Sequence, residues 1–333
     1  MVVTSIVPPT GDKLLFSLFG CPSILLDLSL VEERTGLVMK VEARNPQPFL
    51  KWAGGKRSIL AEITQLFPAF EGRYIEPFVG AGAVFFSLDK QTPKLLNDFN
   101  ADLVEVYEVV RDSLPQLLRE LKKHENNKEH FLRVRALDRD PSFMKLSPVV
   151  RAARFIYLNK TCFNGLYRVN RLGQFNVPFG KQSNPDVIAK DNLQAVSNFL
   201  NARANNGKRP QFYSGDYKIV TSLARTGDFV YLDPPYDPLP GADSFVSYQK
   251  NGFSQQDQEA LRDEILRLTD LGVPVLLSNS DTPYIRTLYK DKKKFSILGI
   301  QVTRAIGASA SSRGKIGEVL VTNQPGLKNG SNA

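Results

Sequence analysis

The stretch RYIEPFVGAGAVFFSL (73–88) carries the pattern that decides the fold class. Its first part, 73–78, predicts a short strand. Gly80 and Gly82 follow as a turn signal, and AVFFSL (83–88) predicts the opening of a helix. A glycine turn between a strand and a helix lets a ligand approach the backbone, and the helix N-terminus favours negative charge there.

The rest of the chain alternates between strand and helix patterns. Further strands are predicted at 94–98, 228–233, 273–280, 295–303 and 318–323. Helices are predicted at 55–67, 101–123 with a break at Pro115, 130–137, 149–160, and 254–272 with Ser254 as N-cap and Gly272 as C-cap. Strands that alternate with helices predict an α/β fold with a parallel, doubly wound sheet.

Positive charge is concentrated in one part of the chain. The 333 residues include 43 Lys and Arg against 34 Asp and Glu, a net charge of +9. Residues 119–181 hold 14 Lys and Arg against 5 Asp and Glu, so this block carries the whole surplus. Its last part, KTCFNGLYRVNRLGQFNVPFGK (160–181), mixes basic, aromatic and glycine residues and predicts a hairpin with loops. The block is either a solvated helical face or an element that docks on a nucleic-acid duplex.

Few residues are available for metal or disulfide chemistry. The two cysteines are Cys21 and Cys162, and the two histidines are His124 and His130. A disulfide framework and a cysteine-rich zinc site are therefore excluded, and two histidines provide little material for a His-centred metal site. From these counts we expect no bound metal. No apolar stretch approaches the roughly 20 residues of a membrane-spanning helix, so we also expect no association with a membrane.

The N-terminal 1–38 differ from the rest of the chain. The run LLFSLFGCPSILL (14–26) is apolar but too short to cross a bilayer, and Lys13 is the one basic residue before it. A start placed upstream of the true initiator, Met39, is one interpretation. An added local element and an export signal are the others. We therefore treat 1–45 as an N-terminal extension of unknown role.

An acidic residue follows the second predicted strand. Asp98 ends 94–98, where a carboxylate can accept hydrogen bonds from both hydroxyls of a ribose. With Gly80 and Gly82, Asp98 favours an adenosine site, whereas the glycines alone are also compatible with a packing turn. The third glycine of a dinucleotide fingerprint is lacking, and no spaced first glycine precedes Lys56 as in a phosphate-binding loop.

The strand 228–233 ends in Asp233-Pro234-Pro235-Tyr236. Two prolines stiffen this turn and remove two backbone donors, which leaves the Asp233 carboxylate and the Pro234 carbonyl as acceptors. Two acceptors beside the Tyr236 ring match an exocyclic amine on a planar base. A rigid turn after a buried strand is the alternative.

Six motifs in order carry a resemblance. They are FLKWAGGK (49–56), IEPFVGAGAVF (75–85), LNDFN (96–100), FNGLYR (163–168), FNVPFGK (175–181) and DPPY (233–236). With this order the chain, over about 46–325, resembles the Dam-type DNA adenine-N6 methyltransferases, the D12 class. The resemblance implies a Rossmann-like methyltransferase sheet with an inserted helical and β-hairpin DNA-recognition domain. It places the catalytic domain at 46–100 and 189–333 and the target-recognition domain at 101–188.

The resemblance also implies a methyl donor, S-adenosylmethionine, and the residues that bind it. The family's cofactor positions correspond to Trp52, Lys56, Phe78, Gly80, Gly82, Asp98 and Asp233. Among these, Lys56 is suited to the methionine carboxylate and Asp98 to the ribose. The catalytic positions correspond to Asp233, Pro234 and Tyr236, where Asp233 holds the target amine.

For DNA, the resemblance implies recognition of GATC in a duplex and flipping of the adenine into the site. The family's DNA-contacting positions correspond to Lys51, Phe163, Asn164, Leu166, Arg168 and Pro178. Arg168 is expected to bind the guanine through O6 and N7. Phe163 stands where the family commonly has tyrosine, and Gln182 where many relatives have an aromatic residue.

Two other classes of protein are weighed against this enzyme. A catalytically inactive DNA-binding protein on the same fold is disfavoured because the DPPY turn, the glycine loop and Asp98 are intact. An RNA or N4-cytosine methyltransferase is disfavoured by Arg168 in its hairpin, and neither cysteine follows a proline as cytosine-C5 chemistry would need. We expect a monomer in the bacterial cytoplasm, associated with the nucleoid. Restriction-modification and DNA replication or repair are both compatible roles.

Overall fold

The computed structural model describes residues 46–180, 182, 185–238, 253–303 and 315–324. The predicted N-terminal extension, 1–45 with Met39, lies outside the described residues. Pro46–Ala333 form one compact unit, and all of the described residues belong to it.

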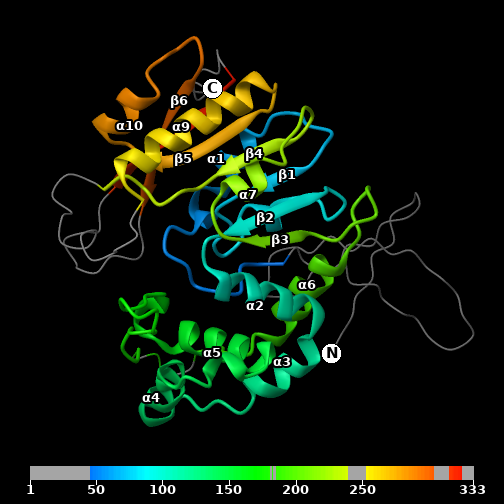
Figure 1. Cartoon of the computed structure of the whole chain (residues 1–333), viewed down its shortest axis with the longest axis vertical. Helices are drawn as coiled ribbons and strands as arrows, with labels where there is room; N and C mark the ends of the chain where they lie inside the picture. Colours follow the sequence, from blue (N-terminus) through cyan, green and yellow to red (C-terminus); the bar gives the residue numbers. More distant parts are fainter. Residues whose placement is uncertain (1–45, 181, 183–184, 239–252, 304–314, 325–333) are drawn as a thin grey trace, which may run out of the picture. The chain divides into compact units, whose positions relative to one another are not determined.

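The described residues form a seven-stranded sheet in the order β3-β2-β1-β4-β5-β7-β6 (Figure 1). The strands are β1 (Tyr74–Glu76), β2 (Lys94–Asp98), β3 (Gln211–Ser214), β4 (Phe229–Leu232), β5 (Val275–Ser280), β6 (Ser296–Thr303) and β7 (Lys315–Thr322). The first five strands pair in parallel, whereas β7 pairs antiparallel with both β5 and β6. The predicted α/β fold is confirmed, but the prediction of an entirely parallel sheet is wrong for its last two strands.

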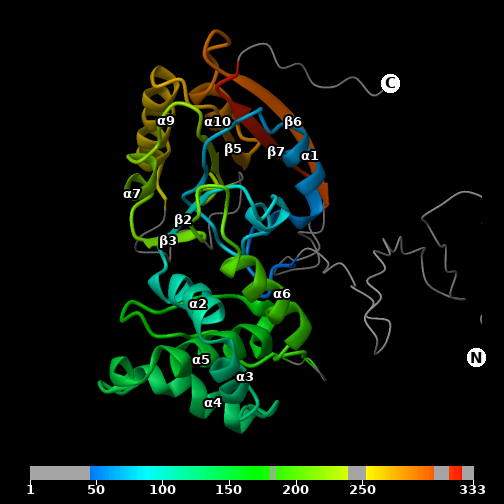
Figure 2. The same ribbon diagram turned by 90° about the vertical axis from the view of Figure 1, so that its right-hand side faces the viewer.

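Helices cover both faces of this sheet. They are α1 (Leu60–Gln65), α2 (Ala101–Asp112), α3 (Leu114–Leu121), α4 (Lys128–Ala136), α5 (Pro148–Thr161), α6 (Lys190–Asn201), α7 (Lys218–Thr221), α9 (Gln255–Asp270) and α10 (Pro283–Leu288). Figure 2 shows α7 and α9 on one side of the sheet and α1 on the other. The predicted break at Pro115 is confirmed, because Pro115 lies in the first turn of α3.

Two hydrophobic clusters account for the two faces. Along β4, Phe229 and Tyr231 belong to one cluster and Val230 and Leu232 to the other, as the two-residue period of a strand requires. All four side chains are fully buried. A strand buried on both faces needs an apolar residue at every position, which is why β4 is a continuous apolar run.

The helices α2, α3, α4 and α5 lie together beyond β3 (Figure 1). The first of the two clusters continues into this group, since Leu103 of α2 and Ile156 of α5 share it with Leu96 of β2. A smaller third cluster forms between α4, α5 and the segment 162–177 around Phe131. The predicted division at residues 100 and 188 therefore crosses a shared core, and it stays a prediction.

Three local predictions differ from the structure. The helix expected at 83–88 is a single 3-10 turn, Phe85–Ser87, because Phe85 and Phe86 are both buried against the rings of neighbouring elements. The strand β3 was not predicted, since its residues are half-buried at an edge and show no alternation. The hairpin expected at 160–181 pairs through two isolated bridges, Cys162 with Phe179 and Val169 with Phe175.

The part of the chain that the structure describes contains no helix long and apolar enough to cross a membrane. Its described residues also contain no group of three or more His, Cys, Asp and Glu side chains that could hold a metal ion.

The two histidines of the chain contact each other between α3 and α4. Nδ1 of His124 lies 3.0 Å from Nε2 of His130, and the His124 ring stacks on Tyr157 at 4.4 Å. Burial, and then the charge of His130, lower the pKa of His124 from 6.5 to about 4.

We expect the free energy of unfolding to fall as the pH drops from about 6.5 to about 4. The unfolded chain binds a proton at His124 in this pH range and the folded chain does not. The contribution of His124 to the free energy of unfolding is therefore fully present above about pH 6.5 and lost as the pH falls to about 4. The loss reaches at most about 3 kcal/mol. Urea unfolding of wild type and His124→Asn at several pH values measures it. The variant should show a flatter pH dependence, and an unchanged slope would contradict the assignment.

Candidate active site

The loop after β1 has a backbone that requires glycine. Gly80 and Gly82 have φ values of +49° and +76°, which residues with a side chain rarely adopt. A Cβ at Gly82 would lie 2.2 Å from Cε1 of Phe85, and one at Gly80 would lie 3.0 Å from Cδ1 of Trp52. The indole of Trp52 therefore covers the backbone of this loop.

Asp98 holds the same loop from the end of β2. Its Oδ2 accepts a hydrogen bond from the Gly80 N–H at 3.0 Å, and its Oδ1 accepts one from the Asn100 N–H at 2.9 Å. The Tyr107 hydroxyl, on α2, donates to the Gly80 carbonyl at 2.9 Å. Burial raises the pKa of Asp98, and the two backbone donors oppose that rise. Because a carboxylate has more lone pairs than these two bonds use, Asp98 can still accept hydroxyl donors.

An ion pair joins the turn after β4 to the N-terminal motif. Nζ of Lys56 lies 2.8 Å from Oδ1 of Asp233 and 4.7 Å from the centroid of the Tyr236 ring. Burial raises the pKa of Asp233, and the Lys56 charge opposes that rise. The structure thus brings Lys56 to Asp233, a carboxylate of the protein itself.

Side chains from α9 and β5 hold the turn in position. Nε2 of Gln258 donates to the Pro235 carbonyl at 2.9 Å, and Nδ2 of Asn279 donates to Oε1 of Gln258 at 3.1 Å. Oδ1 of Asn279 accepts from the Asp237 N–H at 3.1 Å. Both supporting side chains are buried, and sequence analysis did not single out either of them.

The turn presents two acceptors and an aromatic ring. The Tyr236 hydroxyl donates to Oε2 of Glu318 on β7 at 3.0 Å, which fixes the ring. Among the residues that the structure describes, none donates a hydrogen bond to the Pro234 carbonyl. The side chain of Asp233 is 20% exposed, so a ligand can reach it. This corner can accept both N–H groups of an amine.

Sequence analysis missed Glu76, which ends β1 directly before the glycine loop. Its side chain is buried and accepts a hydrogen bond from the Tyr74 hydroxyl at 2.8 Å. Burial raises its pKa well above the ordinary range, and the charge of Asp233 adds to the rise. An acid at the end of a buried strand was the signal that could have identified it.

Three rings also meet at this edge of the sheet. The Phe78 ring lies 5.6 Å from that of Tyr217, which follows β3, and 6.0 Å from that of Phe253, which precedes α9. Nδ2 of Asn97 donates to the carbonyls of Pro77 and Gly215, both at 3.0 Å, and so ties the two loops together. Only tertiary structure brings these rings together, so spacing along the chain had no signal for them.

Five of the six predicted DNA-contacting residues lie in the recognition segment, which we define as 161–180. The Phe163 N–H donates to the Pro178 carbonyl at 2.9 Å, and Nε of Arg168 donates to Oδ1 of Asn176 at 2.7 Å. Phe163, Asn164, Arg168 and Pro178 are exposed. Leu166 instead is half-buried against the third cluster.

The sixth residue, Lys51, is brought to this segment by a side chain that sequence analysis missed. Asn159 of α5 accepts from the Lys51 N–H at 2.9 Å and donates to the Lys51 carbonyl at 2.7 Å. The same amide donates to the Gly165 carbonyl at 3.1 Å. A Cβ at Gly165 would lie 2.3 Å from Cδ of Lys51, so the lysine stem passes directly over the glycine.

Cys162 is not a nucleophile in this arrangement. Its side chain is fully buried, and burial raises the pKa of the thiol to about 11. The thiolate is the reactive form of cysteine, and it is scarce at neutral pH when the pKa is so high.

Comparison with known proteins decides the family. Residues 52–306 match the D12 class N6 adenine-specific DNA methyltransferases. The chain belongs to this family. It is 46% identical over 281 residues to the type II methyltransferase M1.LlaDCHI of Lactococcus lactis subsp. cremoris, a match that covers 84% of this chain and 96% of that protein. It is 33% identical over 290 residues to a DNA adenine methylase of Vibrio cholerae, a match that covers 85% of this chain and 98% of that protein.

Membership of the D12 class confirms the resemblance seen in the motifs, and it makes the chain an adenine-specific DNA methyltransferase. DNA is thus the substrate, and the family implies S-adenosylmethionine as the methyl donor. The individual roles of the site residues stay predictions.

We expect Gly82→Ala to lower the free energy of unfolding by about 3 kcal/mol. A left-handed backbone costs a residue with a side chain about 1–2 kcal/mol, and the contact with Phe85 adds the cost of overpacking. Gly272→Ala is the matched control, because Gly272 has a φ of +69° and nothing within 4 Å of its Cβ position. That control should lose about 1 kcal/mol in urea unfolding. Equal losses in the two variants would show that the loop is not tightly packed.

Proposed function

We propose that this chain transfers a methyl group from S-adenosylmethionine to N6 of adenine in GATC within double-stranded DNA. The observation that carries the proposal is the position of the Asp233 corner, at the same sheet edge as the Gly80 loop and linked to the N-terminal motif through Lys56. A methyl donor and an acceptor amine bound at these two places would be neighbours.

The residues around the loop fit S-adenosylmethionine. Trp52 packs so closely over Gly80 that a side chain there would displace it, so glycine keeps the indole in place as one wall of the donor site. Asp98 can accept the ribose hydroxyls, and the Lys56 ammonium, which already pairs with a carboxylate, suits the methionine carboxylate. The rings around Phe78 offer flat apolar surfaces for a purine. When bound, this donor supplies a methyl group on a sulfonium that is open to displacement.

The corner at Asp233 prepares the adenine amine. The Asp233 carboxylate and the Pro234 carbonyl accept its two N–H groups, which draws the nitrogen lone pair out of conjugation and directs it at the methyl carbon. The Tyr236 ring, fixed by Glu318, stacks on the base. Transfer would be a direct displacement without a covalent enzyme intermediate: the N6–carbon bond would form as the carbon–sulfur bond of the donor breaks, S-adenosylhomocysteine would leave, and the methylated amine would lose one proton to water. The chain's own contribution is alignment and charges placed in advance.

Base flipping brings the adenine to this corner, because N6 within a duplex is out of reach. The exposed Phe163 ring is suited to fill the space that the base leaves. Arg168 is suited to read guanine, and Lys51, Asn164, Leu166 and Pro178 complete the recognition surface. We propose 101–188 as the target-recognition part and 46–100 with 189–333 as the catalytic part.

We also propose that the protein acts as a monomer on nucleoid DNA in the cytoplasm. In support, the described residues of a single chain supply both the donor loop and the amine corner.

Transfer from labelled S-adenosylmethionine tests the proposed function. We expect wild type to label a GATC duplex and not a GTTC duplex of the same length. Asp233→Ala should label neither, because one of the two amine acceptors is lost, while its affinity for the GATC duplex stays within about twofold. Asp263→Ala is the control variant, since it removes an exposed carboxylate from α9 and should transfer normally.

Equal labelling of the two duplexes would overturn the GATC specificity. Wild-type turnover in Asp233→Ala would overturn the catalytic role of the corner.

Replacement of Arg168 tests recognition of the guanine. We expect Arg168→Ala to lose about 1–3 kcal/mol of discrimination against duplexes with a substituted guanine, measured as ratios of kcat/KM. Arg171→Ala, an exposed neighbour in the same segment, should weaken binding to all duplexes alike. If Arg168→Ala also weakens all duplexes alike, its side chain contacts phosphate and not guanine.

A further inference from the structure

Tyr167 directly precedes Arg168 in the recognition segment, and its ring contacts Phe175 of the same segment, with centroids 5.9 Å apart. It stacks on Trp52, with centroids 5.6 Å apart and planes inclined by 24°, and on Phe155 of α5, with centroids 4.9 Å apart. Trp52 and Phe155 also stack, at 6.2 Å. Three rings from the N-terminal motif, α5 and the recognition segment therefore form one packed group.

This group of rings contacts the loop around Gly80, the proposed binding site of the methyl donor and here called the donor loop. Trp52 covers Gly80, whose N–H is held by Asp98 and whose carbonyl is held by Tyr107. The indole lies 3.0 Å from where a Cβ of Gly80 would be, so the loop and the indole are in contact and a shift of the loop toward Trp52 displaces the indole. The indole in turn contacts Tyr167, one residue from Arg168.

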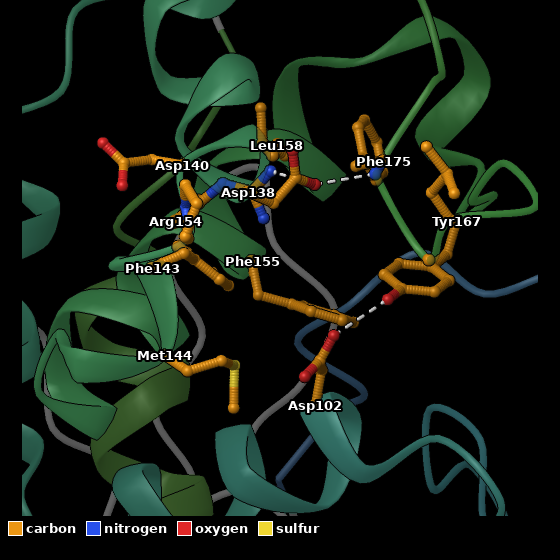
Figure 3. A pocket seen from close by; sticks show the side chains of 13 residues that line it. Asp102, Asp138, Asp140, Phe143, Met144, Arg154, Phe155, Leu158, Tyr167 and Phe175 are labelled. Carbon is orange, nitrogen blue, oxygen red and sulfur yellow. Dashed lines mark hydrogen bonds and ion pairs between the residues drawn. The ribbon is translucent and has the colours of Figure 1, made fainter.

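The hydroxyl of Tyr167 makes a second connection to the donor side. It donates to Oδ2 of Asp102, in the first turn of α2, at 3.1 Å (Figure 3). That helix begins directly after Asn100, whose N–H binds Asp98. Both the ring and the hydroxyl of Tyr167 thus contact elements that position the donor loop.

The far end of the segment is anchored elsewhere. The Phe175 N–H donates to Oδ2 of Asp138 at 2.7 Å, and the same oxygen pairs with the buried Arg154 at 2.7 Å. Between this anchor and Tyr167, the segment lines a cavity of about 340 Å³, whose wall Figure 3 shows with Tyr167 and Phe175 on one side. The cavity leaves space beside the Tyr167 ring and beside the turn at Leu172 and Gly173, which also line it.

We propose that Tyr167 is a positioning residue that couples binding of the methyl donor to recognition of the DNA sequence. The proposal rests on the proposed function, since it takes the Gly80 loop as the donor site and Arg168 as the sequence reader. Binding at the loop fixes Trp52, Trp52 fixes the Tyr167 ring, and the ring sets the backbone from which Arg168 projects. Coupling of this kind is reciprocal, so correct DNA tightens donor binding by the same factor.

Affinity for S-adenosylhomocysteine, a ligand that cannot transfer, measures this coupling. The coupling ratio is the affinity for S-adenosylhomocysteine with a GATC duplex present, divided by that with a GTTC duplex present. In wild type we expect this ratio to be at least about five. Tyr167→Leu should reduce this ratio to about one, with little change in affinity for the ligand alone. Tyr167→Phe keeps the ring and should keep most of the ratio. Phe143→Leu, in the wall of the same cavity, is the control and should keep all of it.

The fluorescence of Trp52 provides a second readout, because Trp52 is the one tryptophan of the chain. We expect a GATC duplex without any donor to change its emission in wild type and in Tyr167→Phe, and a GTTC duplex to leave it unchanged. This measurement needs no destabilising variant, so it tests the proposal even if Tyr167→Leu does not fold. A GATC duplex that leaves the emission of wild type unchanged would overturn the proposal.

The proposal would also be overturned if Tyr167→Leu had the same ratio of S-adenosylhomocysteine affinities as wild type, or if that ratio were one in wild type. These results leave the proposed function intact. Failure of wild type to bind S-adenosylhomocysteine at all would instead contradict the proposed function.

Discussion

The candidate site depends on the parallel pairing of β1 with β4. The chain builds the sheet outward from β1 to β3 and then returns to the other side of β1 with β4. Loops that follow two such strands leave the same edge in opposite directions, and a crevice opens between them. The glycine loop follows β1 and the Asp233 turn follows β4, so one pairing places the two halves of the proposed site side by side. The ion pair from Lys56 to Asp233 joins the second of these halves to the N-terminal motif.

The basic block serves the fold as well as the charge of the surface. Arg154 is 8% exposed and donates to the carbonyls of Val134 and Arg135, in addition to its pairing with Asp138. Arg139 donates to the Phe175 carbonyl at 2.8 Å. The planar guanidinium suits this use, because its several donors can join separate backbone segments. Part of the positive charge that pointed to phosphate contacts therefore holds the recognition segment.

Prediction from the sequence succeeded where neighbours along the chain decide the structure. The strand 94–98 and the N-cap that starts α9 at Ser254 were predicted from local patterns, and the structure confirms both. The prediction of a helix at 83–88 was wrong, because burial of the adjacent Phe85 and Phe86 side chains competes with helix geometry there. Asn159 was missed, since a polar residue in a helix has no distinctive spacing until its partners, Lys51 and Gly165, are known.

The sequence by itself determined the α/β class, the family and the chemical types in the site, because short motifs keep their residue types and their order whatever their distance in space. Tertiary structure alone decided which of those residues meet. Lys56 contacts Asp233, Asn159 contacts Lys51, and Trp52 contacts Tyr167, and each pair is separated by more than 100 residues. Such contacts depend on how whole elements pack around a shared core, and no local periodicity encodes them.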